Sequence, residues 1–410
     1  MNAMNQRVAR PGLVVFTCFL IAALEGYDLQ AFGVAAPALA KLFGLTPGRI
    51  GWLGGMAMIG VVLGALVGGR LADRIGRKPV LVVSVLVFGV FSIGTGMADS
   101  TTTLFLTRLI AGLGFGGAMP NLIAVASEVT EKRWQATIVT LVFCGMPAGG
   151  FSVAMLARLG GPAIDWHTLF YIGGILPLVL VPLIAWVLPE TRPTHEEHTG
   201  TLRTLFGHGR APTTLLLWLA YLLTLLVLYL LLNWLKSLVL AKGMDAKVAD
   251  SATAYFNLTS IVGGVAMGFL IDRFGTRWPL VACYLGLAAA LAGLGAAVDP
   301  DTILLLSGMV GFLVIGGQYS LYALPPRYYG RHERAAGAGA AVGVGRVGSV
   351  IGPVLGGLLR DAGFAPGAVL TALVPVALVA GVAAFALSFR PHVEHAAEGH
   401  PHGGHAHGGH

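Results

Sequence analysis

Long apolar runs alternate with short polar segments along most of the chain. A helix that crosses a bilayer needs roughly 20 predominantly apolar residues, and the pattern supplies such segments repeatedly. The expected spans are residues 12–37, 50–70, 80–97, 104–126, 134–158, 167–189, 213–234, 247–271, 279–298, 302–325, 335–358 and 366–389. The pattern therefore predicts an all-α membrane protein with twelve transmembrane helices.

The spans form two groups of six, separated by a polar stretch. Residues 190–212 interrupt the apolar pattern with charged residues and histidines, and we interpret this segment as a cytoplasmic linker. It separates an N-terminal six-helix half, residues 1–189, from a C-terminal half, residues 213–390. A similar loop recurs in both halves, GRLADRIGRKP at residues 69–79 and GFLIDRFGTR at residues 268–277. Each copy joins two spans at a corresponding place, which indicates two pseudo-symmetric halves.

Composition agrees with a membrane protein and excludes several other classes. Hydrophobic residues make up 56% and charged residues 11% of the chain, and the mean hydropathy is +0.78, which is too apolar for a soluble surface. The net charge of +7 would favour nucleic acid as a partner only if the basic residues clustered on one folded face. Most of them lie in short gaps between apolar runs, so no nucleic acid is predicted.

The chain offers no predicted metal or cofactor site. Its three cysteines lie far apart within apolar runs, which indicates neither a disulfide framework nor a metal knuckle. Residues 391–410 form a histidine-rich tail whose composition is typical of a disordered segment. Clustered imidazoles can bind zinc, nickel or copper, but scattered histidines on a flexible chain form no preformed site.

The distribution of lysine and arginine orients the chain. An even number of spans puts both termini on one side, and the cytoplasmic loops carry the excess of basic residues. Seventeen of the 26 basic residues lie on the side of the termini, seven lie on the other side, and Arg108 and Arg346 lie within spans. Both termini are therefore predicted to be cytoplasmic, and the two intramembrane arginines need a functional explanation.

Several motifs resemble the major facilitator superfamily. The loop at residues 69–79 matches the signature G-x-L-a-D-r-x-G-r-k-p, and residues 189–191 (PET) close the sixth span. Residues 24–30 (LEGYDLQ) and 33–37 (GVAAP) resemble the first helix of the aromatic acid:H+ symporter family, especially its hydroxybenzoate and 3-(3-hydroxyphenyl)propionate carriers. The glycines near Arg108 and Arg346 also resemble that family. Its first helix commonly reads Asp-Gly-x-Asp, whereas this chain has Glu25 in the first acidic position and Asp28 in the second.

The resemblance implies a secondary active transporter that takes up small aromatic carboxylates together with protons by alternating access. It also implies a multi-pass protein of the bacterial plasma (inner) membrane, embedded in the lipid bilayer as a monomer, with no enzymatic activity. In the superfamily the loop at residues 69–79 contacts neighbouring helix ends and stabilises one side of the transport cycle. The gating residues implied in this way are Gly69, Asp73, Arg77, Glu128, Arg133 and Asp272.

Charged residues within the spans are the candidates for proton coupling. An ionised side chain is costly inside a membrane and is expected to face a partner or a wet cavity. Glu25 and Asp28 are three residues apart and share a helical face, while Asp28 and Arg108 fall at a similar depth and can therefore meet. A carboxylate beside a movable cation can bind and release a proton, so these three residues are predicted to couple transport to protons. The alternative is a static structural pair.

Arg346 is the candidate for binding the substrate. It lies near the membrane midplane, where such carriers bind substrate, and its forked donors fit a carboxylate. Alternatively, it caps carbonyls at Pro353 or pairs across the halves with Asp28 or Glu25. An aromatic substrate also needs stacking surfaces and polar groups. The candidates for these, each of which could equally serve helix packing, are Tyr27, Phe32, Tyr229, Asn233, Tyr255, Asn257, Gln318, Tyr319 and Tyr322.

Other functions fit parts of the pattern. Proton-coupled efflux of organic acids or drugs can use the same Asp28 and Arg108, although Arg346 argues against cationic drugs. A membrane sensor that moves no solute is a more remote alternative, because only the linker and the tail offer a signalling surface. No P-loop lysine motif or nucleophile and base pair points to ATP-driven transport or to an enzyme.

Overall fold

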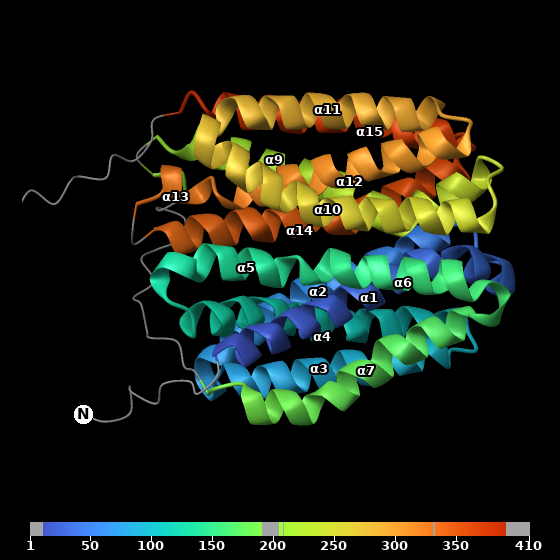
Figure 1. Ribbon diagram of the computed structural model, residues 1–410, viewed down its shortest axis with the longest axis horizontal. Helices are drawn as coiled ribbons and strands as arrows, with labels where there is room; N and C mark the ends of the chain where they lie inside the picture. Colours follow the sequence, from blue (N-terminus) through green and yellow to red (C-terminus); the bar gives the residue numbers. More distant parts are fainter. Residues whose placement is uncertain (1–10, 191–204, 208, 331–332, 391–410) are drawn as a thin grey trace, which may run out of the picture.

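A computed structural model of the chain describes residues 11–190, 205–207, 209–330 and 333–390. Most of the predicted linker and the whole histidine-rich tail lie outside these residues. Long helices run side by side along one axis of the molecule (Figure 1). In the described part of the chain, 12 helices are long and apolar enough to cross a membrane. The prediction of an all-α protein with twelve spans is confirmed.

The N-terminal half builds its six spans from seven α-helices. They are α1 (Pro11–Phe43), α2 (Pro47–Ile75), α3 (Arg77–Gly96), α4 (Thr101–Glu128), α5 (Gln135–Phe143), α6 (Gly145–Gly160) and α7 (Trp166–Val187). Side-chain oxygens of Thr46, Ser100 and Asp165 cap α2, α4 and α7 by accepting backbone N–H groups. Hydrogen bonds from the hydroxyl and the backbone of Thr168 hold the pKa of Asp165 below its ordinary value.

The C-terminal half contains six long helices and one short one. They are α9 (Ala211–Ala241), α10 (Ala246–Phe274), α11 (Arg277–Ala296), α12 (Pro300–Tyr322), α13 (Pro325–Tyr328), α14 (Arg334–Asp361) and α15 (Pro366–Leu387). Several helices run past the predicted spans, and α1 and α9 show this most clearly. Pro37 and Lys236 interrupt the apolar windows but lie inside helices that continue to Phe43 and Ala241.

The fifth span is broken where the sequence predicted one helix over residues 134–158. A single residue, Cys144, separates α5 from α6. Pro147 follows in the first turn of α6, and it has no N–H to donate to the carbonyl of Phe143, four residues earlier. The break therefore has a local cause, and it leaves the Phe143 carbonyl available to another part of the protein.

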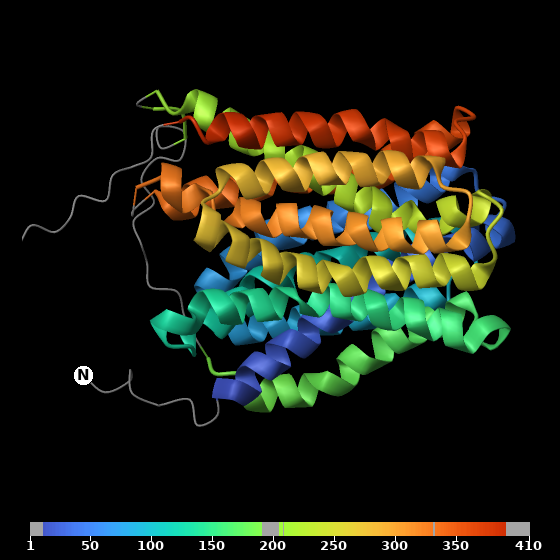
Figure 2. The same cartoon turned by 45° about the horizontal axis from the view of Figure 1, so that its top comes forward.

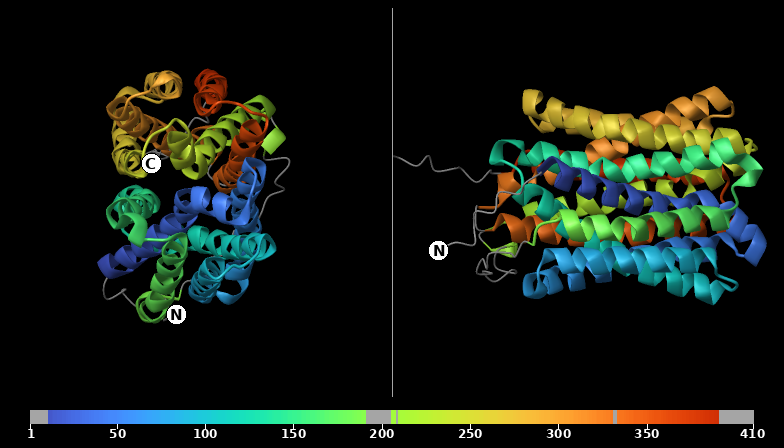
Figure 3. Two further views of the ribbon diagram at one scale, coloured as in Figure 1. Left: turned by 90° about the vertical axis from the view of Figure 1, so that its right-hand side faces the viewer. Right: turned by 60° about the horizontal axis from the view of Figure 1, so that its bottom comes forward.

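The two halves are separate helix groups that meet along one face each. Viewed end-on, α1 to α7 form one group and α9 to α15 the other (Figure 3). Within a half, glycines let backbones touch: Gly60 and Gly64 of α2 face the backbone of Leu109 and Leu113 on α4, where a Cβ would clash. Between the halves, α2 packs against α14, α6 against α10 and α1 against α9.

The contacts between the halves gather at one end of the bundle. The first helix begins and the last helix ends at the same end (Figures 1 and 2), which we call the terminal side; the opposite end is the far side. On the far side the backbone N–H of Gly48 donates to the Asp361 carboxylate at 2.9 Å, and the Arg158 guanidinium donates to the Ser251 hydroxyl at 2.7 Å. The halves are thus closed against each other on the far side.

Candidate functional site

A cavity lies between the two halves and is lined by helices from both. Its walls are mainly apolar and aromatic. Its aromatic and polar lining residues are Gln30, Phe143, Tyr229, Phe256, Asn257, Ser260, Gln318, Tyr319, Tyr322 and Arg346. Six of the residues predicted to bind substrate are therefore brought together here: Tyr229, Asn257, Gln318, Tyr319, Tyr322 and Arg346.

Arg346 supplies the positive charge of the cavity. Its guanidinium donates a hydrogen bond to the Tyr229 hydroxyl at 3.2 Å, and it interacts electrostatically with Glu25 of the other half. It does not cap the Pro353 carbonyl, which instead accepts a hydrogen bond from the Trp234 ring at 2.8 Å. Of the roles considered from the sequence, the structure shows the electrostatic interaction with Glu25 across the halves and no cap on Pro353.

Glu25 is buried without a hydrogen-bonded partner for one of its oxygens. Its side chain is 1% exposed, and Oε2 accepts no hydrogen bond from the described residues. Arg346 is the cation whose charge acts on it. A buried carboxylate that depends on one cation from the opposite half is sensitive to anything else that binds that cation.

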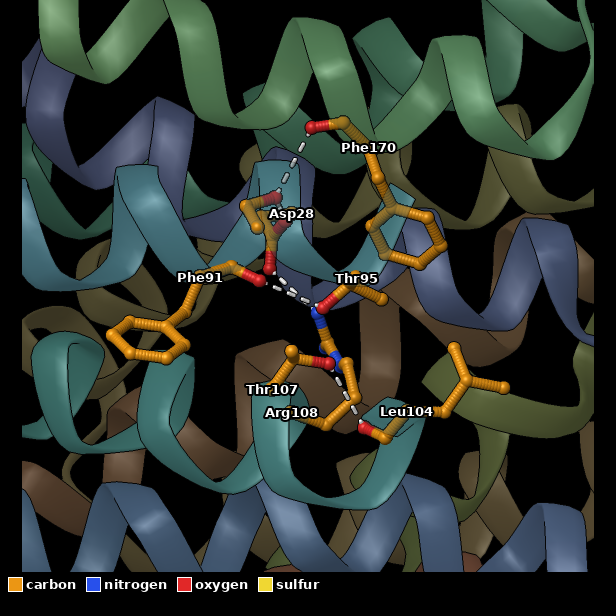
Figure 4. Close-up of polar contacts among 8 residues, drawn as sticks. Asp28, Phe91, Thr95, Leu104, Thr107, Arg108 and Phe170 are labelled. Carbon is orange, nitrogen blue, oxygen red and sulfur yellow. Dashed lines mark hydrogen bonds and ion pairs between the residues drawn. The ribbon is translucent and has the colours of Figure 1, made fainter. Parts of the chain in front are cut away.

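Asp28 and Arg108 form an ion pair at 2.8 Å, with side chains 0% and 1% exposed. Ser92 donates a second hydrogen bond to the Asp28 carboxylate. The Arg108 guanidinium also lies over the rings of Phe32 and Phe170, 5.5 Å from each centroid. Figure 4 shows Arg108 of α4 reaching Asp28 of α1 inside the N-terminal half. The contact between Asp28 and Arg108 that we expected from their similar depth is present in the structure.

Four other candidate residues do not line the cavity. The Asn233 side-chain amide donates to the Tyr229 carbonyl of its own helix at 2.8 Å. Phe32 packs on Arg108, and Tyr27 is buried close enough to Asp28 to interact with its charge. Both therefore belong to the surroundings of the ion pair, and the predicted contact with substrate is not supported in this conformation. Tyr255 is 48% exposed and lies on the outer face beside Leu305.

The remaining polar residues of the cavity differ in whether their polar atoms have hydrogen-bond partners. Gln30 and Asn257 exchange two hydrogen bonds across the halves. The Tyr319 hydroxyl donates to the Phe143 carbonyl at 3.0 Å, and the Tyr322 ring stacks on the Phe143 ring at 5.5 Å between centroids. Gln318, in contrast, has no hydrogen-bond partner for either amide atom among the residues that the structure describes.

The predicted gating network is only partly assembled. Arg77 at the start of α3 pairs with Glu128 at the end of α4, while Arg133 pairs with its neighbour Glu131 on the surface. Asp73, which was expected to contact a helix end, is exposed. Of the other two residues predicted to act in gating, Gly69 has no atom within 4 Å of a Cβ built on it, and Asp272 is exposed.

Gln30 and Phe143 are among the cavity residues that were not proposed from the sequence. Gln30 stands within the motif of the first helix but carries no charge, so the cost of burying ions did not single it out. Phe143 looked like an ordinary apolar residue. The signal that could have found it is Pro147, because a proline four residues on frees the Phe143 carbonyl.

The profile of the Major Facilitator Superfamily matches residues 18–250 and 217–405 of the chain. The chain belongs to this superfamily. It is 41% identical to the 3-(3-hydroxy-phenyl)propionate transporter of Escherichia coli K12, over 92% of this chain and 94% of that protein. It is 35% identical to the 4-hydroxybenzoate transporter PcaK of Pseudomonas aeruginosa, over 94% of both, and 31% identical to the gallate transporter of Pseudomonas putida, over 86% of both.

Solved structures agree on the fold. A bacterial homologue of the human lysosomal transporter Spinster, in an inward-facing and unoccupied conformation, has a TM-score of 0.74 at 17% identity, covering 93% of this chain and 97% of that one. The nucleoside transporter NupG (D323A mutant) has a TM-score of 0.75 at 16% identity, covering 93% and 100%. The major facilitator transporter predicted from the sequence, an integral multi-pass membrane protein and not an enzyme, is confirmed.

Proposed function

We propose that this protein takes up small aromatic carboxylates, such as hydroxybenzoates or 3-(3-hydroxyphenyl)propionate, together with protons. It works by alternating access, as a monomer in the bacterial inner membrane with both termini in the cytoplasm. The observation that carries the proposal is the Arg346 guanidinium in a cavity whose other walls are mainly aromatic and apolar. Three relatives that are named as transporters of aromatic acids support the same substrate class.

Arg346 binds the carboxylate of the substrate in this proposal. A guanidinium offers two parallel N–H donors to a carboxylate, and Arg346 uses one of its nitrogens on the neutral Tyr229 hydroxyl. The rings of Tyr229, Phe256 and Tyr322 line the same cavity, and flat aromatic surfaces suit a flat aromatic ring. The site therefore has a charged end for the carboxylate and an apolar body for the ring.

Glu25 links substrate binding to the proton. A substrate carboxylate on Arg346 competes with Glu25 for the same guanidinium, and two carboxylates cannot both be balanced by one buried cation. Protonation of Glu25 removes its charge and releases Arg346 for the substrate. Asp28, paired with Arg108 of α4, is the second carboxylate of this coupling system.

Uptake into liposomes containing the full chain tests the proposal. We expect labelled 4-hydroxybenzoate or 3-(3-hydroxyphenyl)propionate to accumulate when the outside is made more acidic than the inside, and a protonophore to abolish the accumulation. Both pH values stay above the titration range of the acids, and protein-free liposomes correct for passive entry of the neutral acid. Accumulation that does not exceed the protein-free control for any aromatic acid would refute symport, whereas accumulation only under the reversed gradient would indicate efflux.

A further inference from the structure

Gln318 is a polar side chain in the cavity to which none of the described residues forms a hydrogen bond. It lies on α12, is 2% exposed and lines the cavity together with Tyr319 and Arg346. Neither its amide nitrogen nor its amide oxygen has a hydrogen-bond partner among the described residues. An unpaired buried amide is unfavourable, so its presence at the wall of a ligand cavity calls for an explanation.

Gln30, Asn257 and Ser260 of the cavity have hydrogen-bond partners in the protein, so Gln318 differs from these uncharged polar residues. Gln30 and Asn257 satisfy each other with hydrogen bonds of 2.9 and 2.7 Å. The Ser260 hydroxyl donates to the Phe256 carbonyl at 2.7 Å. Each of these groups has a partner within the protein, whereas Gln318 keeps a free donor and a free acceptor at the cavity.

The chemistry of a free amide limits what it can recognise. A carboxylate only accepts hydrogen bonds and is drawn to the charge of Arg346, while an apolar ring edge offers no hydrogen bond at all. A phenolic hydroxyl both donates and accepts, as an amide does. We propose that Gln318 hydrogen-bonds a hydroxyl group on the substrate ring and makes the cavity selective for hydroxylated aromatic acids over their unsubstituted counterparts.

This assignment rests on the proposed function and adds a second recognition point to it. Arg346 on α14 holds the carboxylate, and Gln318 on α12 reads the hydroxyl. When an acid without the hydroxyl binds, the Gln318 amide stays buried and unpaired. The free-energy cost of the unpaired amide therefore weakens binding of the unsubstituted acid and not of the hydroxylated one. Selectivity then comes from the cost of leaving Gln318 unsatisfied.

Matched pairs of substrates test the assignment with the full chain in liposomes. The pairs are 4-hydroxybenzoate with benzoate, and 3-(3-hydroxyphenyl)propionate with 3-phenylpropionate. For the unaltered protein we expect the KM of the hydroxylated acid to be roughly tenfold lower than that of its partner in at least one pair. In Gln318→Leu and in Gln318→Met, which keep the volume but remove both polar atoms, the ratio should fall to about one.

Ser307→Ala is the matched control. The Ser307 hydroxyl is also buried and unpaired on α12, but Ser307 does not line the cavity, so its loss should leave the ratio unchanged. Equal KM values for both members of both pairs in the unaltered protein would overturn the assignment, as would an unchanged ratio in either Gln318 variant. If neither variant transports, direct binding of the pairs to purified unaltered protein decides. Failure of all four acids to accumulate would count against the proposed function instead.

Discussion

Gln30 and Asn257 join the two halves by a reciprocal pair of hydrogen bonds at the wall of the cavity. The Gln30 amide nitrogen donates to Asn257 at 2.9 Å, and the Asn257 amide nitrogen donates to Gln30 at 2.7 Å. Both side chains are buried. The contact between Arg158 and Ser251 lies further along α10 toward its start on the far side. The amide pair is therefore the innermost seal of the far side, and it has to break for the cavity to open there.

Asn257→Ala should favour opening on the far side. The substitution leaves the Gln30 amide unpaired in the closed state, which costs about 1–3 kcal/mol. In a background without the three native cysteines, a cysteine at Leu29, which lines the cavity, should react faster with a membrane-impermeant thiol reagent added from the far side. Combining Gln30→Ala with Asn257→Ala removes both amides, so the double variant should be less destabilised in its closed state than the sum of the single variants. If the destabilisation of the closed state in the double variant equals the sum for the two single variants, the pair does not seal the cavity.

Tyr319→Phe should loosen the opposite, terminal side of the cavity. The Tyr319 hydroxyl donates to the Phe143 carbonyl across the halves, and that carbonyl is free because Pro147 cannot donate to it. Loss of the bond weakens this contact by about 0.5–1.5 kcal/mol. The cysteine at Leu29 should then react faster with reagent added from the terminal side.

Two further variants isolate this hydrogen bond. Tyr322→Phe keeps the ring that stacks on Phe143 and should change the labelling rate little. Pro147→Ala restores an N–H that competes for the Phe143 carbonyl, so it should resemble Tyr319→Phe. If Tyr322→Phe and Tyr319→Phe have equal effects, the hydrogen bond is not what closes the terminal side.

Asp28→Asn should uncouple transport from protons. The variant cannot cycle between a charged and a neutral carboxyl, so it should lose accumulation driven by a pH gradient while it keeps exchange of labelled for unlabelled substrate. Removing one member of a buried ion pair also costs about 3–5 kcal/mol of stability, and thermal unfolding in detergent measures this loss. Asp250→Asn is the matched control, because Asp250 pairs with Lys236 at 2.6 Å outside the cavity lining. Accumulation by Asp28→Asn at the unaltered level would remove Asp28 from the coupling role.

Arg346→Ala and Arg346→Lys should separate charge from shape in substrate binding. Hydrogen bonds to charged groups contribute about 1.5–3 kcal/mol, so Arg346→Ala should raise the KM for an aromatic acid by roughly ten- to hundredfold. Arg346→Lys keeps the charge but cannot form two parallel hydrogen bonds with a carboxylate. Its KM should therefore lie between the values for the unaltered protein and for Arg346→Ala. Equal KM values in all three proteins would assign Arg346 to structure.

Glu25→Gln should lower the KM or leave it unchanged, because the competing carboxylate is gone.

The sequence predicts the twelve helices that are long enough to span a membrane and the Asp28 and Arg108 pair well, for a shared physical reason. Both follow from the cost of placing polar or charged groups in hydrocarbon, which is visible in a single chain. The Gln30 and Asn257 pair could not be found in this way, since neutral amides are less conspicuous and the partners are 227 residues apart.

A second limit on predicting the site from the sequence was the direction in which each side chain points. Tyr27 and Phe32 lie on α1, where residues on every side of the helix are buried over residues 25–36. A helix that is apolar all round gives no periodic signal for which face meets a cavity. The sequence therefore placed these residues in the right helix but could not tell the cavity from the interior of the N-terminal half.

Gly51→Ala should disturb closure of the far side through backbone contact alone. A Cβ at Gly51 of α2 would lie 2.6 Å from the Pro353 carbonyl of α14, so the two halves must separate locally to accommodate it. Gly343→Ala on α14 is the matched control, because nothing lies within 4 Å of a Cβ there. The control should gain about 0.5–1 kcal/mol of stability from the better helix former, whereas Gly51→Ala should lower the thermal unfolding temperature and raise reactivity of the cysteine at Leu29 from the far side. Equal labelling rates in the two variants would mean that close approach of α2 and α14 does not control access to the cavity.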